Sequence, residues 1–139
     1  MGMVYAKIEL TNAEDLGLAR RHIIGEEEIK RINVRMLADS GAYMMAINES
    51  IQAQLELPFI EKRKAVMVDN SIREFDVVGP IMVKFKNRTG ICNAYLLEGN
   101  SEPLLGAIPM EELDVLIHPL RQELLVNPEH PNYAVLYMK

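Results

Sequence analysis

Cysteine, tryptophan and long apolar segments are scarce in this chain. It has one cysteine, Cys92, and no tryptophan among 139 residues. No internal disulfide can form, so the fold depends on its core. No apolar run approaches the roughly 18 residues that a membrane-spanning helix needs, and no basic segment followed by an apolar one opens the sequence. We therefore expect a soluble, cytoplasmic protein without a membrane partner.

Basic residues are also outnumbered, with 15 Lys and Arg against 20 Asp and Glu and a formal net charge of -5. Counterion release on a nucleic acid needs a broad cationic face, so we expect no nucleic-acid partner. His22, His118 and His130 lie far apart without the spacing of metal ligands. The phosphate-loop, zinc-peptidase and nucleophile-elbow motifs are missing too. We predict no metal and no other cofactor.

Short alternating apolar segments make up most of the chain. Its hydrophobic content of 49% suffices for one core, so we expect a single domain over residues 1–139. Period-two alternation predicts strands over 4–10 and 32–38. Further predicted strands cover 64–68, 72–78, 81–85, 91–97, 104–107 and 134–138. Short strands at this spacing predict a predominantly β fold, a small barrel or sandwich.

Two segments predict short helices. Asn48 is a good N-cap, and Pro58 stops the segment that it begins. Pro109 suits a first helical turn, and the helix is expected to continue over 110–117. The polar segment 11–28 is expected to be a long connection with a helical turn.

One acidic turn stands out as a candidate site. Asp39, Ser40 and Gly41 directly follow the apolar strand 32–38 and precede a further apolar stretch, 44–47. Asp-Ser-Gly is ordinary turn composition, so a structural turn is the simplest interpretation of these residues alone. A carboxylate framed by two apolar segments is unusual, and Asp39 is therefore also a candidate catalytic acid.

The order of three features supports the catalytic interpretation. A strand runs into Asp39-Ser40-Gly41-Ala42, a polar hairpin tip follows at residues 68–71, and Leu104-Leu105-Gly106 precedes a short helix. This order resembles the retroviral-type, or retropepsin-like, aspartic peptidases. The likeness is to single-domain bacterial and archaeal members, in which a Leu-Leu-Gly-Ala-x-Pro-Leu-Glu-like segment precedes a short helix. Here the segment reads Leu104-Leu105-Gly106-Ala107-Ile108-Pro109-Met110-Glu111.

The resemblance implies an all-β fold, a small closed β-barrel of the acid-protease type with one or two short helices. Asp39 would be the catalytic aspartate, supported by a loop of Ser40, Gly41 and Ala42. The apolar strand against that loop would be Leu104, Leu105 and Gly106. The flap over the substrate would be Val68, Asp69, Asn70 and Ser71.

The flap tip lacks glycine, which leaves Asn70 as the residue there that best tolerates a left-handed backbone. The chain has one Asp-Ser-Gly motif, whereas bilobal relatives have two Asp-Thr/Ser-Gly motifs. The resemblance therefore implies a homodimer that brings together one Asp39 from each subunit. Either terminal strand, 4–10 or 134–138, is a candidate for the subunit interface, and we favour the C-terminal one.

The predicted function is hydrolysis of peptide bonds in a peptide or protein substrate by a homodimeric aspartic endopeptidase. Two facing carboxylates cannot both ionise cheaply, so they share a proton, and one activates water while the other protonates the substrate. The alternative is a catalytically silent dimeric module that binds a peptide or protein on the same fold. An unrelated small β-barrel binding protein is the third possibility.

Overall fold

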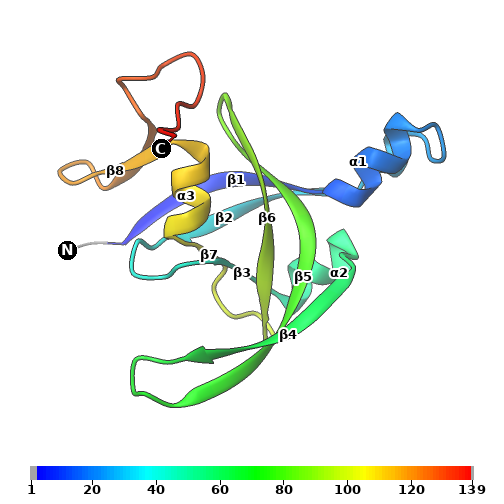
Figure 1. Ribbon diagram of the computed structural model, residues 1–139, viewed down its shortest axis with the longest axis horizontal. Coiled ribbons are helices and arrows are strands. Elements are labelled where there is room, and N and C mark those ends of the chain that lie inside the picture. The colour runs from blue at the N-terminus through cyan, green and yellow to red at the C-terminus, as the bar shows by residue number, and fades with distance from the viewer. Residues whose placement is uncertain (1–2, 139) are drawn as a thin grey trace.

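The computed structural model describes residues 3–138, which form mostly β strands with three short helices (Figure 1). The helices are α1 (Ala13–Arg20), α2 (Glu49–Leu55) and α3 (Ala107–Leu113), and a 3-10 turn, η1, lies at Glu26–Glu28. The strands are β1 (Val4–Asn12), β2 (Arg31–Ala38), β3 (Met45–Asn48), β4 (Phe59–Val66), β5 (Ile72–Phe85), β6 (Arg88–Leu97), β7 (Leu104–Leu105), β8 (Val115–His118) and β9 (Glu123–Val126). None of the helices in this part of the chain has the length and apolar character needed to cross a membrane. The predicted mostly β fold is confirmed.

Seven of the strands form one sheet that closes on itself. Its order is β1-β2-β7-β3-β6-β5-β4, and β1 pairs with β5 as well as with β2. Hydrogen bonding therefore runs around a ring of six strands, and β4 lies outside the ring, where within residues 3–138 it pairs with β5. The apolar side chains without any exposure form the centre of the core: Ile8, Leu10, Met36, Met45, Ile47, Leu55, Ile81, Ala94 and Leu105. Burial of each large member stabilises the fold by roughly 1.5–3 kcal/mol.

The helix α1 is longer than the helical turn that the sequence predicted in this segment. The structure extends β1 to Asn12 and begins α1 directly after it, where a long connection was expected. Asn12 is 2% exposed, its side-chain oxygen accepts from the amide of Asp15 at 3.2 Å, and its Nδ2 donates to the carbonyl oxygen of Leu55 at 2.9 Å. One asparagine thus caps α1 and joins it to the end of α2.

One of the two predicted helices is confirmed, and the other prediction is partly wrong. The helix after Asn48 is confirmed as α2, and the Asn48 side chain accepts from the amide of Ile51 at 2.9 Å. The prediction over 110–117 is wrong in its second half, because α3 ends at Leu113. Asp114 adopts the left-handed conformation with φ of 53°, which ends the helix and turns the chain into β8.

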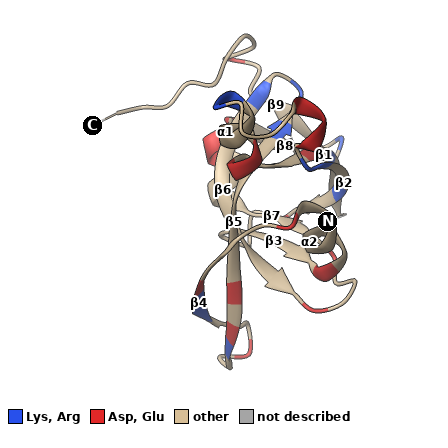
Figure 2. Cartoon of the chain, turned by 90° about the vertical axis from the view of Figure 1, so that its right-hand side faces the viewer, with Lys and Arg blue, Asp and Glu red and all other residues tan. Residues whose placement is uncertain are grey.

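A long hairpin of β4 and β5 projects from the ring, and Figure 2 shows charges of both signs along it. The expected turn is present, with the Met67 amide bonded to the Ser71 carbonyl oxygen at 2.8 Å. The predicted strand 64–68 ends earlier, because Met67 belongs to this turn. The predicted break between 72–78 and 81–85 is instead a bulge at Gly79–Pro80 within the single strand β5.

The predicted strand 134–138 is wrong, since no strand lies in that segment of the described chain. The segment leaves the body of the protein (Figure 2), and no strand within residues 3–138 pairs with its backbone. Among the described residues of the segment, the amide of Val135 donates a hydrogen bond to Asp114 Oδ2 at 3.0 Å. β-Prone residues without a partner strand do not form a sheet.

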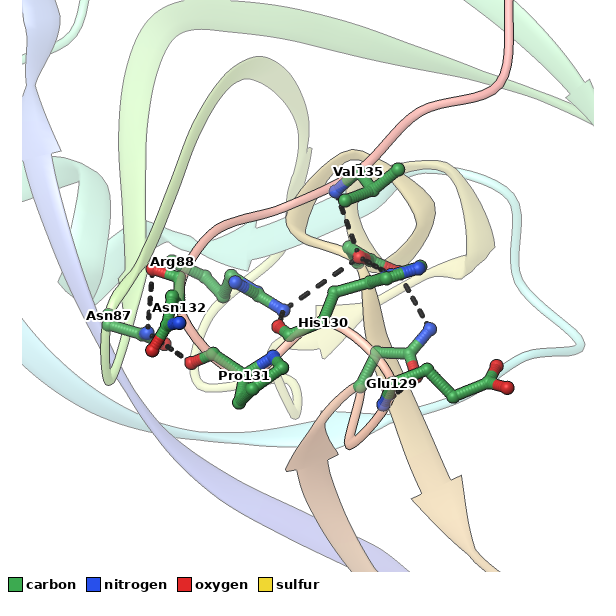
Figure 3. Close-up of polar contacts among 9 residues, drawn as sticks. Asn87, Arg88, Glu129, His130, Pro131, Asn132 and Val135 are labelled. Atoms are coloured by element: carbon green, nitrogen blue, oxygen red, sulfur yellow. Dashed lines mark hydrogen bonds and ion pairs between the residues drawn. The ribbon is translucent and has the colours of Figure 1, made fainter.

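A polar cluster holds the segment 127–135 against the rest of the fold (Figure 3). Arg88 is 1% exposed; it donates to the carbonyl oxygen of His130 and lies 3.8 Å from Asp114 Oδ2. The amide of Val135 and the side chains of Asn127 and His130 donate to the Asp114 carboxylate and lower its pKa to about 2. The start of the C-terminal segment is therefore fixed by polar side chains.

Candidate active site

Asp39 lies where β2 ends, and backbone hydrogen bonds on both sides fix it. Its amide donates to the carbonyl oxygen of Leu105 at 2.9 Å, and its own carbonyl oxygen accepts from the amide of Ala42 at 3.1 Å. The amide of Gly41 donates to Asp39 Oδ1 at 2.9 Å. Oδ2 has no hydrogen-bond partner within residues 3–138, and the side chain is half-buried. One carboxylate oxygen is thus anchored by the loop and the other is free.

β7 lies between β2 and β3, beside the end of β2 that leads into the Asp39 loop. It runs parallel to β2, with Leu104 opposite Leu37 and Leu105 opposite Ala38, and antiparallel to β3. Leu105 has no exposed surface. The structure therefore brings the apolar segment 104–105 beside the residues that precede Asp39, where desolvation and packing stiffen the strand end.

Gly106 lies against the far side of the same loop. A Cβ at this position would be 2.7 Å from the carbonyl carbon of Tyr43, and closer still to the carbonyl oxygen of Met44. Only glycine permits this approach of two backbones. The next two amides donate into the loop, from Ala107 to the carbonyl oxygen of Ala42 at 2.7 Å and from Ile108 to that of Tyr43 at 2.9 Å. The first residues of α3 therefore hold the loop through backbone hydrogen bonds.

Ser40 and Tyr43 extend from the loop into solvent. Ser40 is exposed, and its hydroxyl makes no hydrogen bond within the described chain. Tyr43 is 77% exposed. Both side chains are accessible to a molecule that approaches the carboxylate of Asp39.

The tip of the β4–β5 hairpin is ordered by its own polar residues. The amide and hydroxyl of Ser71 donate to Asp69 Oδ1 at 2.9 and 2.5 Å, and the hydroxyl above all holds the pKa of Asp69 below its ordinary value. Asn70 has φ of 66°, which confirms the left-handed backbone expected there. Val68 is fully exposed beside it. Figure 1 shows this tip on the same side of the molecule as the loop between β2 and β3.

Two hollows on the described part of the chain lie away from Asp39. One of about 230 Å³ lies beside the hairpin and is lined by residues from α2, β5 and β6 with four carboxylates, Glu49, Glu74, Asp76 and Glu98. Another of about 400 Å³ lies between β1 and β2. Neither is lined by Asp39. Glu49, the β5 residues Glu74 and Asp76, and Glu98 come from three separate parts of the sequence, which is why no motif indicated them.

Other kinds of chemistry have little support in the described residues. No three His, Cys, Asp or Glu side chains within residues 3–138 are grouped as metal ligands would be. Burial raises the pKa of Cys92 to about 12, with a smaller effect of Glu112. A thiol that stays protonated is a poor nucleophile at neutral pH.

The comparisons with known proteins give a fold and no family. No protein-family model matches the sequence, and no curated protein matches it. A solved structure that does match is the retroviral protease-like domain of Ddi1 from Leishmania major, with a TM-score of 0.54 and 14% identity over 92% of this chain and 90% of that chain. The fold is therefore retroviral-protease-like, as the sequence motifs indicated.

Proposed function

We propose that this chain is one subunit of a homodimeric aspartic endopeptidase. The observation that carries the proposal is the support of Asp39: its loop is bonded to Leu105 on one side and to the start of α3 on the other. A catalytic carboxylate must be held in one geometry, and such support provides it. The retroviral-protease-like fold agrees with this assignment.

The chemistry follows from two copies of the same carboxylate. With Oδ1 of Asp39 bonded to Gly41, Oδ2 is available to face its symmetry mate. Two carboxylates that face each other a few ångströms apart cannot both ionise cheaply, so the pair would share one proton. The ionised member removes a proton from water as it attacks the peptide carbonyl, and the protonated member donates to the carbonyl oxygen. No cofactor takes part.

The hairpin tip and the loop supply the remaining roles. Residues 68–71 would act as a flap over an extended substrate, whose backbone can pair with exposed strand edges. Ser40, without a partner in its own chain, would bond across the two-fold axis to the opposite loop. Tyr43 would border the cleft and contribute to the choice of substrate side chains.

A second function is favoured by three exposed apolar side chains in and beside the hairpin tip. Val66, Val68 and Ile72 are each exposed by 66% or more. Such a surface binds peptides or proteins without any chemical step. The alternative is therefore a catalytically silent dimeric binding module with the same fold.

The two functions are separated by Asp39→Asn, which removes the charge and keeps the shape. We expect the wild type to cleave a denatured protein or peptide library between pH 4 and 7, and the variant to lose cleavage by at least about a thousandfold because its nucleophilic water is no longer activated. Sedimentation of the variant must show the dimer of the wild type. Equal cleavage by both proteins, or none by either at any pH, would leave the binding module as the function.

A further inference from the structure

The hollow between β1 and β2 has a lining of one charge sign. Its volume is about 400 Å³, a size that accommodates a side chain or a small ligand. The residues that line it are Tyr5, Ala6, Lys7, Asn33, Val34 and Arg35. Two of them are basic and none is acidic, although the whole chain has a formal net charge of -5. The hollow is therefore a local cationic site on an acidic protein.

The two basic residues of the hollow face each other across the strands. Lys7 lies opposite Arg35 in the antiparallel register of β1 and β2, and both are exposed. Like charges at directly opposed positions repel each other and lower the stability of a sheet. Within residues 3–138 neither Lys7 nor Arg35 forms an ion pair that would offset this repulsion. An anion bound between the two side chains would remove the cost.

Arg35 is oriented in a way that suits a carboxylate. Its Cζ lies 3.8 Å from the centre of the Tyr5 ring, and stacking on an aromatic ring orients the planar guanidinium group. The N–H edge of a stacked guanidinium can donate two parallel hydrogen bonds to the two oxygens of one carboxylate. The ammonium group of Lys7 and the amide of Asn33 are further donors in the same lining. The chemistry of the hollow therefore favours a carboxylate.

Two acidic residues lie near the hollow without lining it. Glu102, through a hydrogen bond above all, raises the pKa of Tyr5 above its ordinary value. Glu9 lies opposite Asn33, the next outward pair along the two strands. Because neither carboxylate is paired with Lys7 or Arg35 within residues 3–138, both cations remain available to an external anion.

The position of the hollow relates it to the candidate active site. Arg35 and Leu37 alternate with the buried Met36 and Ala38, so both lie on the outward face of β2. Asp39 follows directly at the end of the strand. Arg35 precedes Asp39 by four residues, or about 13 Å of extended chain at roughly 3.3 Å per residue. An extended peptide that lies across Asp39 therefore reaches Arg35 with about four residues.

We propose that this hollow binds an Asp or Glu side chain of the substrate polypeptide, about four residues from the bond that is cleaved. The inference rests on the proposed function and deepens it, because it makes acidic polypeptides the substrate class. Arg35 donates two N–H bonds to the bound carboxylate, and Lys7 supplies the second positive charge. The carboxylate also relieves the repulsion between these two residues, so an acidic side chain is preferred to a neutral one of the same shape.

Peptide binding tests the hollow separately from cleavage. The probe is a fluorescent, otherwise apolar decapeptide with Glu four residues from its central bond on either side, compared with the same peptide carrying Gln or phosphoserine there. The full chain with Asp39→Asn is used, so that the peptides stay intact. Fluorescence anisotropy is expected to show that the Glu peptide binds about tenfold or more tightly than the Gln peptide. This preference should weaken as the salt concentration is raised.

Charge reversal at Arg35 is expected to abolish the preference for Glu. Arg35→Glu places a carboxylate opposite Lys7, which replaces repulsion by attraction across the strands, so the variant should fold, and thermal unfolding checks this. Arg35→Lys keeps the charge without the two-pronged donor and should retain only part of the preference. Arg21→Glu is the matched control, because Arg21 is exposed at the end of α1, away from the end of β2 (Figure 1). It changes the net charge equally and should bind as the parent does.

The outcomes keep the site and the peptidase function distinguishable. The site is overturned if the Glu and Gln peptides bind equally, if Arg35→Glu keeps the preference, or if the phosphoserine peptide alone binds. If the Glu peptide binds through Arg35 while the wild type cuts nothing, the hollow stands as a site for acidic segments and the peptidase function fails. If the wild type cuts, Asp39→Asn does not, and acidic peptides are neither bound nor cut in preference, the function stands and the site fails.

Discussion

Gly106 connects the backbone of the candidate site to the rest of the fold. It is buried, and the atoms that a Cβ would meet belong to the backbone of Tyr43 and Met44. Backbone atoms cannot rotate away as a long side chain can, so any side chain at 106 displaces the loop that follows Asp39. Precise placement of a reacting group is worth several orders of magnitude in rate.

Gly106→Ala is therefore expected to lower the free energy of unfolding by about 1–3 kcal/mol through overpacking, and to reduce cleavage more than stability alone explains. Gly17→Ala is the control, because nothing lies within 4 Å of a Cβ there. Gly17 is inside α1, so alanine should stabilise the protein by about 0.5–1 kcal/mol. Urea unfolding of both variants measures the two changes. Equal stability of the wild type and Gly106→Ala would mean that the loop shifts to accommodate the methyl group without lowering the free energy of unfolding.

The local backbone geometry at single residues of the candidate site could be foreseen because its signals are local. An acidic turn after an apolar strand marks Asp39, and the left-handed backbone at Asn70 follows from a turn without glycine. The double role of Asn12 could not be foreseen in the same way. Its cap on α1 is local, but its bond to the Leu55 carbonyl oxygen depends on how two helices pack.

At the scale of elements, the sequence predicted strands and helix starts better than the ends of elements. The predicted helix over 110–117 failed because Asp114 takes a left-handed conformation, which is supported by bonds from Asn127, His130 and Val135. Those partners follow Asp114 in sequence and meet it only in the folded chain. The prediction of a strand over 134–138 was wrong for a related reason. These residues have β propensity, but no strand within residues 3–138 lies beside them to pair with.

The polar cluster gives this C-terminal segment a defined dependence on pH. The pKa of Asp114 is lowered in the folded state to about 2 from an ordinary 3.8. A depressed pKa contributes stability above the ordinary value, and the contribution is lost as pH falls through the folded-state pKa. Asp114→Asn should therefore be less stable than the wild type from pH 5 to 7, and the difference should shrink between pH 4 and 2.

Thermal unfolding at several pH values measures this difference. Glu129→Gln, an exposed residue of the same loop, is the control and should match the wild type throughout. A difference between Asp114→Asn and the wild type that persists unchanged at pH 2 would show that the charge of Asp114 does not hold the segment.

At the scale of the whole molecule, one chain offers half of the proposed catalytic pair. Mixing equal amounts of wild type and Asp39→Asn tests this directly, because random exchange leaves a quarter of all dimers with two intact aspartates. If both carboxylates are required, the total activity of the wild-type chains should fall to about half after exchange. Activity that stays at the value before mixing would mean that each subunit works alone.

The insertion of β7 between β2 and β3 also has a consequence for biosynthesis. Asp39 is made early, whereas Leu105, Ala107 and Ile108, which bond its loop, are made only after the β4–β5 hairpin and β6. Contacts between such distant residues form late, because a long intervening loop must close first. A nascent chain therefore carries the aspartate on an unsupported loop while it is still on the ribosome. The proposed catalytic geometry is therefore complete only once residues 104–108 are in place.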